Sequence, residues 1–226
     1  MSYAVKEIFY TLQGEGQQAG RPAVFCRFAG CNLWSGREED RASAQCRFCD
    51  TDFVGMDGTL GGRYDADALA DTIARCWPVP DAKAGEGGLL PGRPLVVMTG
   101  GEPLLQLDAE LIAAVHARGF EIAVESNGTL AAPPGIDWLC VSPKAGNDLV
   151  QRSGHELKVV VPQAGFDEAA LLAFEALDFA SLRVQPMDSP TLPGAQANNQ
   201  AWAVQWCLDH PRWSLSVQTH KVLLIR

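Results

Sequence analysis

The stretch 95-LVVMTGGEP-103 decides the fold, because it joins an apolar run to a glycine pair and an acidic residue. Leu95 to Thr99 is a continuous run of the kind found in strands buried on both faces of a parallel sheet. Gly100 and Gly101 have no Cβ, so the backbone after this strand can approach a ligand closely. The stretch therefore predicts a central strand whose carboxyl end carries a binding loop.

Short apolar runs alternate with helical patterns on both sides of this strand. The expected strands span residues 5–11, 24–28, 95–99, 120–125, 138–142, 157–161, 181–185 and 215–218. The expected helices span residues 65–77, 108–118, 167–177 and 197–209. Asp65 is a suitable N-cap for the first helix and Gly119 a suitable stop for the second. This alternation predicts βα units and a mostly parallel sheet, either open or curled into a partial barrel.

Polar residues follow six of the expected strands. In α/β folds of this class the functional site lies at the carboxyl ends of the strands. The six segments are 13-QGEG-16, 99-TGGE-102, 125-ESN-127, 142-SPK-144, 185-QPMD-188 and 218-QTHK-221. So many polar strand ends exceed what loops alone require, and they predict one shared site.

Composition narrows the class of protein. The 226 residues fit one ordinary domain and contain 47% hydrophobic and 20% charged residues, as expected for a soluble globular chain. The net charge of −9 argues against a nucleic-acid partner and favours small-molecule chemistry. We expect no membrane span and no secretory signal, because no apolar run is long enough and the N-terminus lacks a basic segment followed by an apolar one.

The seven cysteines are unevenly distributed, with four between positions 26 and 49. Fourteen residues separate Cys31 from Cys46, and two separate Cys46 from Cys49. One interpretation is three thiolates on a four-iron cluster, with one iron left open for the amine and carboxylate of S-adenosylmethionine. A structural zinc site with Cys26 as the fourth ligand fits the spacing equally well. Inert buried cysteines are a third interpretation.

The neighbourhood of these cysteines resembles the radical S-adenosylmethionine superfamily, in which an aromatic residue precedes the third cysteine and GGEP follows a strand. The gap between the first two cysteines is longer here than the usual three residues. Nearly the whole chain is similar to the 7-carboxy-7-deazaguanine synthase family, some members of which carry the longer gap. The similar segments are 8-IFYTLQGEG-16, 25-FCRF-28, 46-CRFC-49, 49-CDT-51, 142-SPK-144, 185-QPMD-188 and 218-QTHK-221.

This resemblance implies a partial, modified (β/α)6 barrel with a mostly parallel, curled sheet. It implies a single radical S-adenosylmethionine domain over residues 1–226, with an extended cluster-binding loop at about 30–62. A Gly- and Pro-rich excursion at 78–94 lies outside the motifs. The implied activity is that of a carbon-nitrogen lyase that converts 6-carboxy-5,6,7,8-tetrahydropterin to 7-carboxy-7-deazaguanine and releases ammonia. The cleaved cofactor would supply a 5′-deoxyadenosyl radical that takes hydrogen from C6, and the cofactor would be regenerated.

The resemblance also implies which residues bind the cofactors. Cys31, Cys46 and Cys49 would hold a [4Fe-4S] cluster, and Thr51 would bind Mg²⁺, although a turn that Thr51 caps is an alternative. The residues expected to contact S-adenosylmethionine are Phe48, Cys49, Asp50, Gly101, Ser142, Pro143, Lys144, Gln185, Pro186, Met187 and Asp188. Taken alone, several of these would be ordinary loop residues.

A second set is expected to bind the pterin. Arg27 matches a carboxylate as a bidentate fork, and Gln13 can both donate and accept. The full substrate-binding set is Leu12, Gln13, Gly14, Arg27, Thr99 and Arg226, the last through its carboxylate. Glu125 and His220 are the catalytic candidates, with an ion pair and a solvated tail histidine as their respective alternatives. We expect the apolar end 222-VLLI-225 to be held against the protein.

The resemblance further implies a flavodoxin or ferredoxin as electron donor and a homodimer, and the acidic charge fits a cytoplasmic enzyme. Two other functions stay open at this point. One is another enzyme of the superfamily, such as an activase that forms a glycyl radical in a partner. The other is a zinc-stapled binding module without catalysis.

Overall fold

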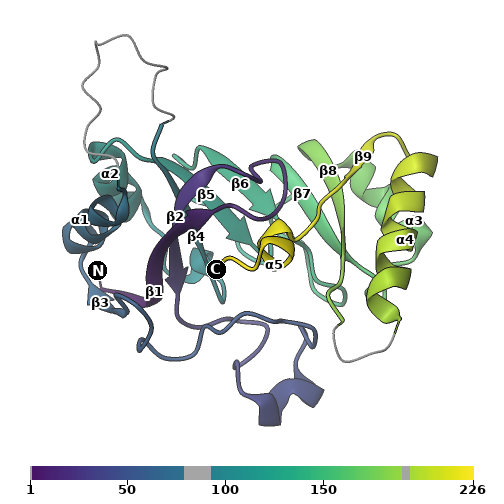
Figure 1. The fold of residues 1–226 in the computed structure, drawn as a ribbon, viewed down its shortest axis with the longest axis horizontal. Helices are drawn as coiled ribbons and strands as arrows, with labels where there is room; N and C mark the ends of the chain where they lie inside the picture. Colours follow the sequence, from purple (N-terminus) through teal and green to yellow (C-terminus); the bar gives the residue numbers. More distant parts are fainter. Residues whose placement is uncertain (1, 79–92, 190–193) are drawn as a thin grey trace.

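The computed structural model describes residues 2–78, 93–189 and 194–226 (Figure 1). The expected excursion at 78–94 therefore lies, apart from its ends, outside the described residues.

One nine-stranded sheet runs through the described residues, in the order β3-β1-β2-β4-β5-β6-β7-β8-β9. The strands are β1 (Tyr3–Leu12), β2 (Pro22–Phe28), β3 (Gly62–Tyr64), β4 (Leu95–Gly100), β5 (Glu121–Ser126), β6 (Trp138–Val141), β7 (Ser153–Val161), β8 (Asp178–Pro186) and β9 (Trp213–Leu215). From β2 to β9 every neighbouring pair is parallel, whereas β1 is antiparallel to β2 and to β3. The predicted α/β class with a mostly parallel sheet is confirmed, and the sheet is open along β3 and β9, as a partial barrel requires.

Among the described residues, α-helices lie in four of the connections between strands, and the short helix between β2 and β3 lies in a fifth. The helical segments are η1 (Glu38–Ser43), α1 (Ala66–Cys76), η2 (Pro103–Leu105), α2 (Ala109–Ala117), α3 (Glu168–Ala173), η3 (Phe174–Ala176), α4 (Ala195–Asp209) and α5 (Thr219–Leu223). Asp65, Asp108 and Asp167 cap the N-termini of α1, α2 and α3 by accepting a backbone N–H. Residues 127–137 and 142–152, which join β5 to β6 and β6 to β7, contain no helix, so the alternation is interrupted there.

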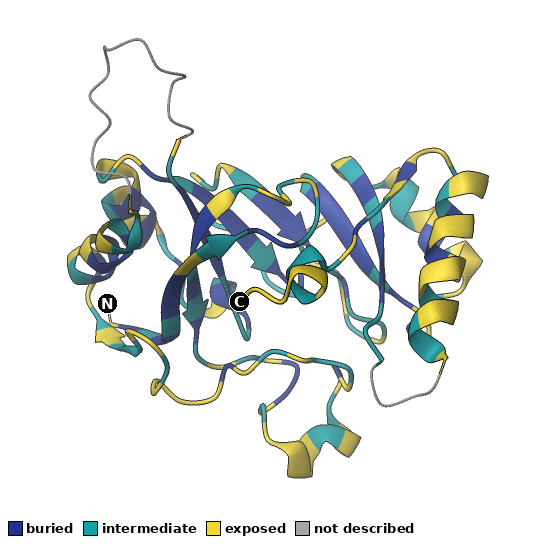
Figure 2. Ribbon diagram, in the orientation of Figure 1, coloured by how far each residue is buried: buried dark blue, intermediate teal, exposed yellow. Residues whose placement is uncertain are grey.

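The two faces of the sheet differ in chemistry, because successive side chains of a strand point to opposite faces. Val24 and Cys26 of β2, Met98 of β4 and Val124 of β5 belong to the main buried core, against which the helices pack (Figure 2). Their neighbours in the sequence face the other way. That other face carries Arg27, Thr99, Glu125, Lys158 and Gln185, one from each of five strands. The face opposite the helices α1 to α4 therefore has a row of polar side chains near the strand ends.

Most of the expected elements are confirmed, with shifts of a few residues at their ends. Within the described residues four elements were missed: the edge strand β3, the short helices η1 and η2, and the terminal helix α5. The last expected strand, 215–218, is wrong in position, since β9 ends at Leu215. Ser216 still bonds to β8, but the chain then leaves the sheet, because Gln218 and Thr219 bond to the loop after β1.

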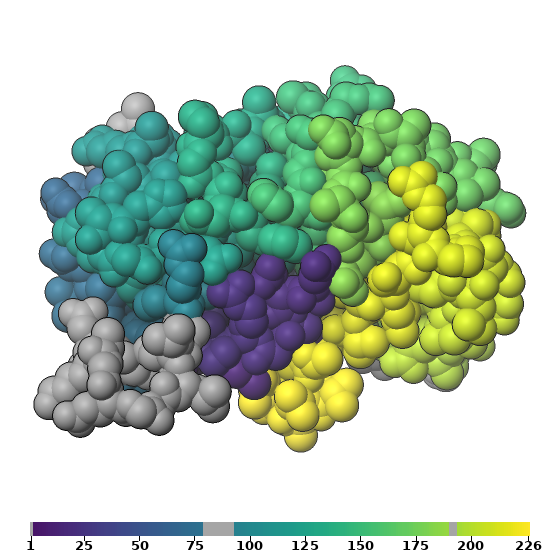
Figure 3. Space-filling model, turned by 90° about the horizontal axis from the view of Figure 1, so that it is seen from above, coloured from purple at the N-terminus to yellow at the C-terminus, as the bar shows by residue number. Residues whose placement is uncertain are grey.

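The C-terminal segment lies beside the end of β1 and the loop that follows it, where the purple and yellow surfaces meet in Figure 3. Thr219 donates its backbone N–H and its hydroxyl to the carbonyl of Gly14, each at 2.9 Å. The hydroxyl of Thr11 donates to the backbone oxygen of Arg226 at 2.8 Å. The expected anchoring of the end is thus polar, since Val222 and Leu224 are 72% and 91% exposed.

Among the described residues, none of the helices combines the length and the apolar character needed to cross a bilayer.

Candidate functional site

Two adjoining cavities open at the carboxyl ends of the strands. The first has a volume of about 190 Å³ and the second about 300 Å³. They share five lining residues, which mark the junction between them: Glu15, Asp50, Thr51, Glu125 and Gln218.

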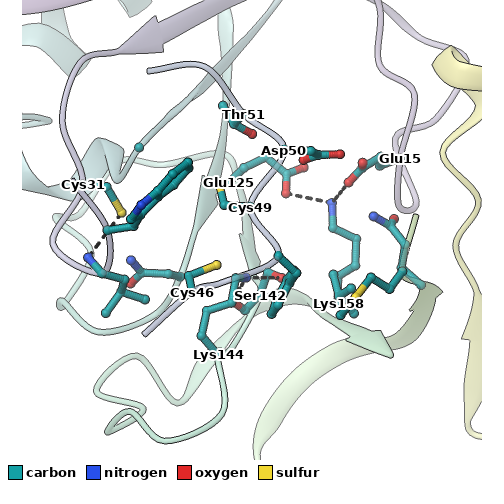
Figure 4. Close-up of a pocket in the computed structure, with 18 of the residues that line it drawn as sticks. Glu15, Cys31, Cys46, Cys49, Asp50, Thr51, Glu125, Ser142, Lys144 and Lys158 are labelled. Carbon is teal, nitrogen blue, oxygen red and sulfur yellow. Dashed lines mark hydrogen bonds and ion pairs between the residues drawn. The ribbon is translucent and has the colours of Figure 1, made fainter. Parts of the chain in front are cut away.

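The first cavity brings together the expected cofactor residues (Figure 4). The expected residues that line it are Cys31, Cys46, Phe48, Cys49, Asp50, Thr51, Gly101, Ser142, Lys144, Gln185, Pro186, Met187 and Asp188. Pro143 is buried beside these residues and does not line the cavity. The set comes from residues 29–61, here called the cysteine loop, and from the ends of β4, β6 and β8, as expected for a site built at strand ends.

The cysteine pair Cys46 and Cys49 is closely coupled. The Cys46 thiol donates a hydrogen bond to Cys49, which lowers the pKa of Cys49 to about 6 despite burial, and a bond from the N–H of Thr51 adds to the effect. The same bond, together with burial, raises the pKa of Cys46. Cys49 is thus poised as a thiolate, the form that binds metal.

Arg41 holds the turn that contains this cysteine pair. Its Nη1 donates to the carbonyls of Arg47 and Cys49, at 2.8 and 3.0 Å. Its Nε bonds to the carboxylate of Glu38, and its guanidinium lies 4.2 Å from the centroid of the Trp34 ring. The long insert between Cys31 and Cys46 therefore supplies a clamp for the second and third cysteines.

The 100-GGEP-103 segment has a structural role beyond lining the cavity. A Cβ on Gly101 would lie 1.9 Å from the carbonyl oxygen of Gly30, so glycine is needed for the cysteine loop to pack against this strand end. Glu102 is fully buried and accepts hydrogen bonds from Leu104 N, Ser126 Oγ and Asn127 N. Burial raises the pKa of Glu102. This carboxylate connects the end of β4 to the end of β5.

Two lysines organise the rim of the first cavity. Lys144 Nζ donates to the carbonyl and the hydroxyl of Ser142, at 2.6 and 2.8 Å, and burial lowers its pKa. Lys221 of α5 pairs with Asp50 at 2.5 Å and with Asp188 at 2.6 Å. Lys221 therefore links the cysteine loop to the end of β8.

The second cavity brings together the expected substrate and catalytic residues. Those that line it are Leu12, Gln13, Gly14, Arg27, Thr99, Glu125, His220 and Arg226. Arg27 Nε pairs with Glu7 Oε1 at 2.9 Å. Arg226 pairs with the other oxygen of Glu7, and its guanidinium lies 4.5 Å from the centroid of Phe9. Two arginines therefore share one carboxylate at this wall.

The loop after β1 fixes the far wall of the second cavity. Gln13 is 4% exposed, donates to Glu125 Oε1 at 3.2 Å and accepts the N–H of Glu15 at 3.1 Å. A Cβ on Gly14 would lie 2.3 Å from His220 Nδ1, so glycine lets α5 bring its histidine against the loop. The side chain of Gln13 thus bonds within the protein.

Sequence reasoning missed Lys158, and it gave Glu15 no role beyond its place in the polar segment 13-QGEG-16. Lys158 Nζ lies 2.8 Å from Glu15 Oε2 and 2.9 Å from Glu125 Oε2 (Figure 4). The sequence 157-LKVVV-161 could have revealed Lys158, because it is a single charged residue in an apolar strand. Side chains of a strand alternate between two faces, so Lys158 points away from the core that Leu157 and Val159 enter. Asn127, Gln218 and Lys221 lie in polar segments that the sequence assigned to the site without a role for them. The other missed lining residues include Glu7, Trp34, Asp52 and Phe53.

The four-cysteine zinc alternative is not supported. Cys26 is fully buried in the main core and does not line the cavity of the other three cysteines. Within the described ranges, no three His, Cys, Asp or Glu residues are grouped closely enough to hold one metal ion. Sulfurs bound to one zinc lie within about 4 Å of each other, whereas a cluster binds each sulfur at a different iron.

The fold and the site together define an α/β protein with a cysteine-lined cavity next to a second, polar cavity at the ends of the strands. No family model matches the chain. It is 62% identical, over the full length of both chains, to a 7-carboxy-7-deazaguanine synthase of Bradyrhizobium diazoefficiens, and 59% identical to one of Burkholderia multivorans, again over the full length. The crystal structure of QueE from Escherichia coli superposes with a TM-score of 0.70 at 26% identity, covering 97% of this chain and 95% of that one. The chain belongs to the 7-carboxy-7-deazaguanine synthase family.

Proposed function

We propose that this enzyme converts 6-carboxy-5,6,7,8-tetrahydropterin to 7-carboxy-7-deazaguanine and releases ammonia, as a carbon-nitrogen lyase that makes a 7-deazapurine precursor of queuosine. The observation that carries the proposal is the division of the site, in which the expected cofactor residues line one cavity and the expected substrate residues line the cavity next to it.

The first cavity suits a [4Fe-4S] cluster and S-adenosylmethionine. Cys31, Cys46 and Cys49 all line it, and three thiolates leave one iron of such a cluster open. When bound and reduced, this pair supplies the radical chemistry, and S-adenosylmethionine is used catalytically. The protein's part is to hold the cysteines, with Arg41 on the turn between Cys46 and Cys49.

Strand ends around the cluster are suited to the rest of S-adenosylmethionine. Ser142 and Lys144 after β6, and Gln185 and Asp188 at the end of β8, present hydroxyl, ammonium, amide and carboxylate groups to the cavity. Lys144 offers a cation for the methionyl carboxylate, and Asp188 offers acceptors for ribose hydroxyls. Gly101 offers backbone at the same wall.

The second cavity suits a small acid with a pterin ring. Arg27 and Arg226 place two cations at one wall, where Arg27 would bind the substrate carboxylate. Leu12, Gly14 and Thr99 line the space for the ring, and the Arg226 carboxylate is the proposed partner of the pterin amino group. Glu125 and His220 are the proposed catalytic residues, since both line this cavity and can accept a proton.

Thr51 is the proposed protein ligand of Mg²⁺, since it lies at the junction of the two cavities and has a hard oxygen. Substrate and water would complete the octahedron. We expect removal of Mg²⁺ with a chelator to lower turnover at least tenfold and Mg²⁺ addition to restore it. Unchanged turnover in metal-free buffer would reject this ligand.

The proposed partners are a flavodoxin or ferredoxin as electron donor and a second copy of the chain, in the cytoplasm. Exposed apolar side chains on α4 and at the C-terminus, such as Leu208 at 70% and Leu223 at 58% exposure, favour self-association. Sedimentation velocity of the reconstituted protein tests the homodimer.

The experiment that tests the function is anaerobic incubation of the reconstituted, reduced protein with the pterin acid and S-adenosylmethionine. The expected product is lighter than the pterin by one ammonia, as mass analysis would detect. An unchanged pterin in the presence of S-adenosylmethionine cleavage would point to another enzyme of the superfamily.

A further inference from the structure

A buried lysine separates two carboxylates at the junction of the cavities. The Lys158 side chain is 4% exposed, and its Nζ contacts Glu15 and Glu125 at 2.8 and 2.9 Å. Figure 4 shows the ammonium between the two acids, with Glu125 on the side of the cysteine loop. Both acids line both cavities. The three groups therefore face the place where cofactor and substrate would meet.

The fold alone does not require a lysine at this position. Leu157 and Val159 on either side point into the main core, and Val160, two residues along the same face, is apolar. Burying an ion pair costs desolvation, and replacing such pairs by apolar side chains is often neutral or stabilising. A charge kept at this point on β7 therefore suggests a task at the site.

The two carboxylates sit in different surroundings. Glu15 also accepts a hydrogen bond from Gln218 at 2.8 Å, and although burial opposes the charge, Lys158 and this amide lower its pKa to about 2. Burial raises the pKa of Glu125, Lys158 opposes that effect, and the nearby Glu15 and Glu156 add to it. When neighbouring acids are pushed apart in this way, one stays ionised and the other is suited to exchange a proton.

We propose that Lys158 is a positioning residue that holds Glu125 against the bound pterin as the carboxylate that exchanges a proton, with Glu15 as a fixed anion. This inference rests on the proposed function. After ring contraction the departing nitrogen is an amino group on a ring carbon. Glu125 takes a proton from the adjacent ring carbon, the electrons of that C–H bond form the ring double bond as the C–N bond breaks, and the proton goes to the amino nitrogen, which leaves as NH₃. The carboxylate is unchanged at the end, and the pterin and the product differ by NH₃ alone.

The charged and titratable groups that face Glu125 come from three elements. They are Lys158 and Glu156 on β7, Glu15 after β1 and Cys140 on β6. Removing the lysine charge in Lys158→Met should raise the pKa of Glu125 by roughly 1–3 units. Because an ionised Glu125 is needed, the acid limb of the kcat profile moves to higher pH by the same amount. Glu15→Gln removes a like charge and moves this limb to lower pH.

The first test measures product formation against pH for wild type, Lys158→Met, Lys158→Arg and Glu15→Gln. We expect the methionine variant to shift upward, the arginine variant to stay near wild type and the glutamine variant to shift downward. A limb that stays fixed in Lys158→Met overturns the proposal. If Lys158→Met does not fold, as thermal unfolding would reveal, the direction of the Glu15→Gln shift decides instead.

A second measurement separates this inference from the proposed function. Carbon-13 NMR of labelled glutamate carboxyls follows the titration of Glu125, assigned with Glu125→Gln, in protein without pterin. A higher pKa in Lys158→Met supports the role of Lys158 even if no form turns over the pterin, and that lack of turnover would count against the proposed function alone. An equal pKa in wild type and Lys158→Met overturns the inference even if turnover is normal.

Discussion

The sheet ends and the cysteine loop build the two halves of the site by different means. Thr99, Glu125 and Gln185 sit on strands whose backbones are paired on both sides, and a fully buried Glu102 joins two of these strand ends. Residues 29–61 contain only the short helix η1, which has no buried residue. The parts of both cavities that the strand ends supply are thus set by the sheet, whereas the proposed cluster ligands depend on a few side-chain bonds.

Those few bonds are identifiable. Lys6 donates to the carbonyl of Val54 and pairs with Asp52 and Asp57, which fixes the end of the loop to β1. Arg41 clamps the turn of the second and third cysteines. Because metal binding and local folding are coupled in such segments, we expect the cluster itself to supply much of the order of the loop. Substitutions in the cysteine loop should therefore lower cluster binding, whereas substitutions at the strand ends should lower the free energy of unfolding.

The largest effect is expected from a substitution that removes one proposed cluster ligand and leaves the sheet intact. Cys49→Ala removes one of three ligands, so bound iron after reconstitution should fall to the background level, with at least a 100-fold loss of S-adenosylmethionine cleavage. Iron analysis and the cluster absorption measure this. Cys207→Ala on α4 is the matched control and should keep its iron. Full iron in Cys49→Ala would contradict the ligand assignment.

A smaller effect is expected from breaking the framework between β4 and β5. Glu102→Ala leaves Ser126 Oγ and the N–H of Asn127 buried without their acceptor, which should cost about 2–4 kcal/mol of unfolding free energy. Denaturant unfolding of the apoprotein measures this. Glu39→Ala in the exposed part of the cysteine loop should stay within about 0.5 kcal/mol of wild type. Equal losses of unfolding free energy in the two variants would contradict the claim that the strand ends are more firmly held than the cysteine loop.

The smallest effect is expected from removing the Arg41 hydrogen bonds that hold the turn between Cys46 and Cys49. Arg41→Gln removes the donors to the carbonyls of Arg47 and Cys49, which should slow cluster reconstitution about three- to tenfold and leave unfolding of the sheet unchanged. Stopped-flow absorption during reconstitution, with hydrogen exchange of residues 46–51, measures both. Arg37→Gln in the same loop, whose side chain has only a 3.8 Å ion pair, is the control. Reconstitution at the wild-type rate in Arg41→Gln would contradict the role of Arg41 in holding this turn.

The sequence predicted the sheet and most of the site because the signals there are periodic or local. Apolar runs located most of the strands, and polar residues after the strands marked both cavities. Lys158 was missed because its strand was treated as an apolar run instead of as two faces. The ties of α5 to Gly14, and of Lys221 to Asp50 and Asp188, join segments far apart in the chain, and no local pattern predicts such contacts. The edge strand β3 is three residues long, which is too short to show an alternating pattern in the sequence.

The claim that one cavity holds the cofactor within reach of a pterin in the other is tested most directly by isotope transfer. The reconstituted, reduced enzyme is incubated anaerobically with the pterin acid deuterated at C6 and with unlabelled S-adenosylmethionine, and the adenosyl group is analysed by mass spectrometry. Deuterium in 5′-deoxyadenosine or in recovered S-adenosylmethionine is the expected result. Cleavage of S-adenosylmethionine with no deuterium in either, while all the label stays in the pterin, would contradict it.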